Sequence, residues 1–231
     1  MKTKLHIINQ SNFSKFSQFV KQHSQELTPR CFSEQFGYLE NDFLHNGELD
    51  NFCINSKILI EESIKEKRKD LASIIISSLC KIVGLPDGKL EEFAKIGLQI
   101  ASDNNDTIHM MGRLEDLRRL YFGKNNYFKQ YLNTLFQEEK CLQHIIDNYR
   151  EIRDNNKTIF RTIKPIISYK KMLAFIQIDI AKLTKNYHPK EAEQRLLSAK
   201  ELLIGTNNAK TYKYIDMLLD KISNSNIEVL A

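Results

Sequence analysis

Lysine and arginine residues gather in one segment of the chain, residues 155–185, together with large apolar side chains. Seven basic residues against one acidic residue, Asp179, give this segment a net charge of +6, whereas the whole chain of 231 residues carries +5. Basic groups interleaved with aromatic rings contact phosphates and stack on bases, and they also attract acidic proteins. The segment is therefore our candidate partner-binding region.

On a helix, most of these charges project to one side, which Phe160, Ile167 and Phe175 share, while Lys170 projects elsewhere. Pro165 is expected to interrupt or kink this helix, so the helical phase beyond it stays open. Three interpretations remain: an acidic protein or peptide partner, a nucleic acid, or no specific role, because lysines also cover apolar surface at solvated edges. The candidate partner-binding residues are Lys157, Arg161, Lys164, Lys171, Lys182 and Lys185.

A second feature is a carboxylate in an apolar helical stripe. Glu138 lies within a helical pattern over about residues 125–152 and projects toward its apolar side. A carboxylate in that position has a raised pKa or a cationic partner. We interpret Glu138 as half of a structural ion pair, and we interpret Asp179, within the apolar run 172–183, in the same way. The candidate partners of Glu138 on the preceding helix are Arg113, Arg118 and Arg119.

The motifs of common catalytic and cofactor sites do not occur in the sequence. There is no glycine-rich phosphate loop, no H-E-x-x-H or paired E-x-x-H, and no G-x-S-x-G nucleophile turn. Cys141 and His144 are spaced to share one face of a helix, but zinc takes three or four protein ligands. We therefore expect no metal and no cofactor. An enzyme or toxin whose site is assembled from residues distant in sequence remains a second alternative.

The four cysteines form no C-x-x-C pair, and their spacing suits neither a zinc site nor a disulfide framework. We expect reduced, buried thiols, which predicts a reducing compartment. The apolar run near the N-terminus is too short for a signal peptide, and no run approaches the ~18 apolar residues of a membrane span. The sequence thus predicts no membrane association and a cytoplasmic location.

Helical periodicity recurs along nearly the whole chain, and glycine (8) and proline (4) are scarce, which disfavours a turn-rich β fold. We expect eight to ten helices, with the longest patterns over about 56–83 and 125–152. Short strands at Ile74–Ile76 or Ile176–Ile180 are the alternative, but no hairpin turn signals flank them. Pro189 marks a helix start. Four glycines that follow apolar runs predict left-handed residues after helix ends, at Gly47, Gly84, Gly123 and Gly205.

These glycines and Pro165 are separated by 37, 39, 42 and 40 residues. Repeats of helical hairpins take about 34 to 47 residues, so the spacing indicates stacked hairpins. The expected fold is all-α, with helical hairpins stacked as an α-solenoid, and a globular helical bundle is the alternative. We expect residues 1–55 to form an N-terminal cap or subdomain and residues 56–231 to form the helical-repeat domain.

Residues 187–203 resemble half of a tetratricopeptide repeat. Ala192, Leu196 and Ala199 have the small–large–small spacing of the second helix of that family, and Tyr187 matches the aromatic residue before the turn. The turn is longer than the family's, the preceding helix lacks the family's small residue at a matching offset, and Ile204 stands where a closing proline is usual. The resemblance implies a right-handed helical array with a concave peptide-binding face.

The sequence thus predicts a non-enzymatic adaptor or regulator that binds a protein or peptide through its helices. Lys164, Lys171, Lys182 and Lys185 are expected to act as electrostatic anchors for that partner. A nucleic-acid-associated factor that uses the same segment is the first alternative, and it predicts steeply salt-dependent binding.

Overall fold

The computed structural model describes residues 13–23, 25–155 and 163–228, and these residues form helices and connections without a strand. The predicted all-α class is confirmed, with eleven α-helices in the described residues rather than eight to ten. The helices are α1 (Phe13–His23), α2 (Pro29–His45), α3 (Leu49–Lys65), α4 (Lys69–Leu79), α5 (Asp87–Asp103), α6 (Thr107–Tyr121), α7 (Phe128–Asp147), α8 (Tyr149–Asn155), α9 (Ile166–Thr184), α10 (Pro189–Leu202) and α11 (Ala209–Glu228), with a 3₁₀ turn, η1 (Asn125–Tyr127), before α7.

The connections explain where the helices end. All four predicted glycines have a positive φ between 72° and 87°, so the prediction of left-handed residues after helix ends is confirmed. Pro189 is the first residue of α10, as predicted. Pro165 immediately precedes α9, where its fixed φ of −54° and its missing N–H cost no hydrogen bond.

The helical pattern over residues 56–83 corresponds to the end of α3 and to α4, and a turn after Lys65 separates the two helices. Lys67 is left-handed, with a φ of 59°, and the Arg68 N–H donates to the carbonyl of Ser63. Asn105 (φ 53°) makes an equivalent turn 38 residues later, since the Asp106 N–H donates to the carbonyl of Ala101. Both turns close the helix with the hydrogen bonds of a Schellman motif, and the first was missed because it contains no glycine.

The single helix expected over residues 125–152 is wrong, because α7 ends at Asp147 and α8 begins at Tyr149. Between them, the Asn148 side chain donates a 3.0 Å hydrogen bond to the carbonyl of His144, and the Asn148 backbone N–H donates to the same oxygen. An asparagine side chain that bonds its own backbone neighbourhood competes with helix continuation, which accounts for the break.

The chain forms two compact units, residues 1–106 and residues 107–231. The boundary expected at residue 55 lies inside α3, and the two units divide instead between Asp106 and Thr107. The physical reason is packing: Phe52 and Cys53 precede that expected boundary, yet they share one apolar core with Leu59 and Ile60 of the same helix. A cut at residue 55 would separate side chains that are buried together.

In the first unit, phenylalanine rings join the first three helices. Phe16 of α1 contacts Phe32 and Phe36 of α2, with ring centroids 5.6 and 6.3 Å apart. Phe52 of α3 contacts Phe13 and Phe36 from the other side. Helix α4 packs against α2, α3 and α5. These rings form the core together with buried leucine and isoleucine side chains, which accounts for the frequency of phenylalanine in the first third of the chain.

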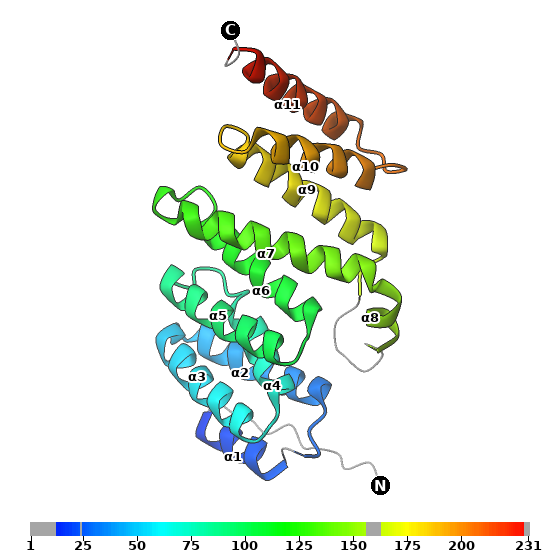
Figure 1. Ribbon diagram of the computed structural model, residues 1–231. Coiled ribbons are helices and arrows are strands. Elements are labelled where there is room, and N and C mark those ends of the chain that lie inside the picture. Colours follow the sequence, from blue (N-terminus) through cyan, green and yellow to red (C-terminus); the bar gives the residue numbers. More distant parts are fainter. Residues whose placement is uncertain (1–12, 24, 156–162, 229–231) are drawn as a thin grey trace. The chain divides into compact units, whose positions relative to one another are not determined.

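In the second unit, helices pack in chain order. Helix α6 packs against α7, α7 against α9, α9 against α10, and α10 against α11 (Figure 1). The short connection from Lys185 to His188 makes α9 and α10 neighbouring antiparallel helices. Helices α7, α9 and α10 therefore each contact the main helix before and the main helix after them.

Small residues bring α9 and α10 together. Ala192, Leu196 and Ala199 of α10 are fully buried in one core with Ala174, Ile178 and Ala181 of α9. Both triplets have the same four-then-three spacing, which lets two backbones approach while one large side chain fills the space between. The small residues of α9 went unidentified in the sequence because they lie inside an apolar run without visible periodicity.

A substitution at Lys67 tests the left-handed turn. We expect Lys67→Gly to raise the free energy of unfolding by about 0.5–1 kcal/mol, because glycine removes the β-carbon clash of a left-handed residue. Glu66→Gly is the matched control, since Glu66 has a φ of −77° and glycine there only adds chain entropy. Urea unfolding of both variants measures the effect, and a loss of stability in Lys67→Gly would contradict the assignment.

Candidate functional site

The structure brings part of the predicted basic segment together on α9. Lys157 and Arg161, with Phe160, lie outside the described residues. Lys164 lies just before α9, Lys171 and Lys182 lie on it, and Lys185 caps its C-terminus. Over residues 163–185, five lysines against Asp179 leave a net charge of +4.

One partly exposed face of α9 carries Lys171, Phe175, Asp179 and Lys182, spaced by four, four and three residues. We call these four residues the α9 face. Phe175 is 46% exposed, although the opposite side of the same helix is buried through Leu173, Ile176 and Ile180. Of the side chains predicted to share one side, Lys171, Phe175 and Lys182 do so on this helix. Asp179, which the sequence suggested as half of a structural ion pair, lies among them with a side chain that is 36% exposed.

Lys182 contacts two other groups. Its Nζ lies 3.7 Å from Oδ1 of Asp179 one turn earlier, and 5.9 Å from the ring centroid of Tyr214 on α11. The cation attracted to the electron-rich ring face links the C-terminal half of α9 to α11. Tyr214 is itself 37% exposed, so the α9 face continues onto α11 through an aromatic ring.

The backbone of Lys164 is held by two tyrosines. The Tyr149 hydroxyl donates a 3.1 Å hydrogen bond to the Lys164 carbonyl, and the Lys164 N–H donates to the Tyr169 hydroxyl at 3.3 Å. The Lys164 Nζ lies 3.9 Å from the sulfur of Met172. These contacts direct the charge of Lys164 along the first turns of α9. Lys171 and Lys185 are half-buried, as expected of lysines whose stems cover apolar surface.

The α9 face also reaches toward α7. Burial, followed by the charge of Asp179, raises the pKa of Tyr131 on α7, so the Asp179 carboxylate lies close enough to act on that phenol. The Tyr131 ring in turn contacts Phe122, with centroids 5.8 Å apart, and Phe122 is 68% exposed. Exposed aromatic side chains therefore lie on both the α7 side and the α11 side of Asp179 and Lys182.

The second predicted feature, Glu138, is buried between α6 and α7 with 2% of its surface exposed. Of the three candidate arginines, Arg118 is the partner: its Nε lies 2.8 Å from Oε2 of Glu138. The two atoms are close but are not aligned as a hydrogen bond. Arg113 and Arg119 instead pair with Asp116 and Glu115 of their own helix. The ion pair expected from the sequence is present.

Burial is the largest cause of the shifted pKa of Glu138. Loss of solvent raises its pKa to about 7, with a further increase from Glu115, while Arg118 and Arg119 act in the opposite direction. The Arg118 guanidinium favours the charged carboxylate and lowers the pKa of Glu138, whereas burial raises it. Burial has the larger effect, because a misaligned donor replaces only part of the hydration that the carboxylate loses. The carboxyl group of Glu138, buried between α6 and α7, therefore titrates near neutral pH.

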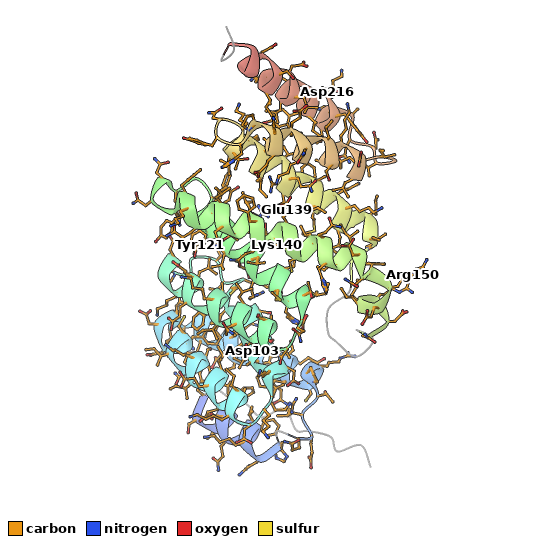
Figure 2. The ribbon with its side chains drawn as sticks, in the orientation of Figure 1. Asp103, Tyr121, Glu139, Lys140, Arg150 and Asp216 are labelled. Carbon is orange, nitrogen blue, oxygen red and sulfur yellow. The ribbon has the colours of Figure 1, made fainter. Side chains whose placement is uncertain are left out.

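An interhelical contact centred on Arg195 was not predicted. Its Nε lies 3.3 Å from Oε1 of Glu139, which lies on α7 (Figure 2). Its guanidinium lies 5.3 Å from the ring centroid of Phe136. Arg195 thereby links α10 to α7 across α9. In the sequence Arg195 appears as an ordinary polar position of α10, and only its partner 56 residues earlier, on another helix, gives it this role.

Cys141 and His144, the two residues considered for metal binding, have different surroundings. Cys141 is buried, with its Sγ 3.3 Å from the carbonyl of Thr107, whereas the ring of His144 is exposed and contacts Asn148. Within the described residues, no group of three or more metal-ligating side chains comes together. None of the four cysteines forms a disulfide; Cys53 and Cys141 are buried, and Cys31 and Cys80 are half-buried.

Among the described residues, no helix has the length and apolar character needed to cross a membrane. Comparison of the chain with models of protein families, with curated proteins and with solved structures finds no match in any of the three.

Proposed function

We propose that this chain is a non-enzymatic adaptor or regulator that binds a protein or peptide through an array of helical hairpins. The observation that carries the proposal is the α9 face, where a half-exposed phenylalanine lies between two lysines, one of which contacts an exposed tyrosine of α11. Exposed aromatic side chains beside positioned cations are typical of protein interfaces.

Three features support the hairpin array, which would be a solenoid of the tetratricopeptide kind. In the second unit the main helices contact their chain neighbours in order. The turns at Lys67 and Asn105 have the same hydrogen bonds and lie 38 residues apart. The same small–large–small triplet occurs on both helices of the α9–α10 pair. Each feature is expected when one hairpin unit is stacked repeatedly.

The exposure of Phe175 on the α9 face supports a binding role. A large aromatic side chain left half-exposed gives up much of its hydrophobic stabilisation, and burying it against a partner recovers that free energy. The lysines on either side add long-range attraction for an acidic partner. The four thiols without a disulfide suit the reducing cytoplasm, where we expect the adaptor to act.

A nucleic acid is the alternative partner, and the net charge of +4 over residues 163–185 favours it. Asp179 weighs against it, because a carboxylate in the middle of the α9 face repels phosphates where Phe175 would stack on a base.

Photo-crosslinking from Phe175 distinguishes these partners. The full chain with p-benzoylphenylalanine at position 175 is irradiated in an extract of the cells that make it. Leu197 on α10 is the matched control position, since it is 47% exposed and Phe175 is 46% exposed. We expect protein adducts at position 175 that are scarce at 197 and that decrease in a Lys171→Glu, Lys182→Glu background. Nucleic-acid adducts would favour the alternative, and equal labelling of both positions would contradict a partner-binding α9 face.

A further inference from the structure

Lys182 is positioned by its neighbours but is not engaged by a hydrogen bond. Its 3.7 Å approach to Asp179 is longer than the 2.7–3.2 Å of a hydrogen bond, and within the described part of the chain Nζ makes no other polar contact. An ammonium group has three N–H donors. The ring of Tyr214 attracts the cation without taking up those donors. The Lys182 side chain is 44% exposed and thus presents N–H donors to solvent beside an aromatic ring.

Apolar surface lies on both sides of this cation. Phe175 lies two helical turns before Lys182, about 10 Å along the axis of α9 at 1.5 Å per residue. Tyr214 adjoins Lys182 from α11, and Met217, one turn further along α11, is 41% exposed. A segment that places a charge at Lys182 can therefore bury apolar side chains at Phe175 and at Tyr214.

Asp179 is the one acidic residue of the α9 face, and it lies between Phe175 and Lys182. It partly neutralises Lys182, since the two charged atoms lie 3.7 Å apart with both side chains partly exposed. An exposed pair of this kind contributes only about 0.2–1 kcal/mol, so an incoming carboxylate can replace it. Asp179 also repels any incoming carboxylate, so an acidic segment binds well only if it gains apolar contacts as well.

We propose that the partner of the α9 face is an acidic peptide segment whose carboxylate replaces Asp179 as the ion-pair partner of Lys182, while neighbouring apolar side chains contact Phe175 and Tyr214. Asp179 then acts as a competitor for Lys182 that weakens the binding of acidic segments without apolar side chains. This inference rests on the proposed adaptor function and specifies the chemistry of its partner.

Fluorescence anisotropy with labelled twelve-residue peptides tests the inference on the full chain. The first peptide alternates acidic residues with leucine and phenylalanine, the second replaces its acids with lysine, and the third replaces its apolar residues with serine. A twelve-nucleotide single-stranded DNA is the fourth probe. Lys190→Glu is the matched control for Lys182→Glu, because Lys190 shares the exposed side of α10 with Leu197 and gives the same change in net charge.

We expect the acidic–apolar peptide to bind most tightly of the four probes. Lys182→Glu should weaken its binding about 5- to 10-fold, and Asp179→Asn should tighten it about 2- to 5-fold, in line with one or two exposed ion pairs. Lys190→Glu should change the affinity less than about 2-fold. Circular dichroism checks that every variant keeps its helices.

Four results would overturn the inference: tighter binding of the lysine peptide, weaker binding after Asp179→Asn, an equal effect of Lys190→Glu, or Lys182-dependent binding of the DNA above that of the peptides. Specific protein adducts from position 175 without binding of the acidic–apolar peptide would reject this partner chemistry and leave the adaptor function standing. If neither the adducts nor peptide binding is found, both proposals are wrong.

Discussion

Replacing Leu196 with alanine is expected to lower the free energy of unfolding by about 2–5 kcal/mol, the usual loss when a fully buried leucine leaves a cavity. Leu196 has no exposed surface and lies between Ala192 and Ala199 in the core that α10 shares with α9 and α11. The small residues on either side have short side chains and cannot move in to fill the space. The loss should therefore be near the upper part of the range.

Leu197→Ala is the control for this prediction, since it removes the same atoms at the next position, where the side chain is exposed. Its effect should stay within about 0.5 kcal/mol. Urea unfolding followed by circular dichroism gives both values, and hydrogen exchange of the α9 and α10 amides locates the weakened region. Similar losses in the two variants would show that the small–large–small triplet does not hold these helices together.

Acidification from pH 8 to pH 5 is expected to stabilise the chain through Glu138. The pKa of its carboxyl is about 7 in the folded state and about 4.5 in the unfolded state, so above pH 7 folding must bury a charge. As the pH falls through 7, the folded state takes up the proton first, and its stability rises until the unfolded carboxyl is protonated near pH 4.5. The full difference is on the order of 3 kcal/mol.

Glu138→Gln should remove this contribution, because the amide keeps the shape of the side chain without a titrating group. The variant should be more stable than the wild type at pH 8, and the two should approach each other at pH 5. Glu139→Gln, one residue further along α7, is the comparison that should leave the wild-type pH difference in place. Unfolding free energies at several pH values measure all three proteins, and a wild type that loses stability on acidification where Glu138→Gln does not would contradict the raised pKa.

The helical character of this chain follows from local information. Apolar residues recur with helical spacing, the four glycines follow apolar runs, and Pro189 begins a helix, so these features could be predicted from neighbouring residues alone. The helix breaks at Lys67 and Asn148 have local causes too, but both residue types are compatible with helices. Their turn geometry depends on backbone hydrogen bonds that the residue types only weakly favour.

The Glu138 ion pair was predictable in part. Helical projection put the carboxylate on the apolar side of α7, and burial without a cation would be costly, so an arginine of the preceding helix was expected. Which of Arg113, Arg118 and Arg119 supplies it depends on how α6 lies against α7. The structure selects Arg118, because the other two pair within their own helix.

By itself, the sequence determined that the chain is helical, that its basic charge gathers over residues 155–185, and that Glu138 needs a cationic neighbour, because each depends on residue types at helical spacing. Tertiary structure decided which charges meet: Asp179 lies on the exposed face of α9, Lys182 contacts Tyr214 of α11, and Arg195 contacts Glu139 of α7. These pairs join separate helices or depend on which face of a helix is covered by its neighbours. Helical periodicity specifies a face but not the helix that packs against it.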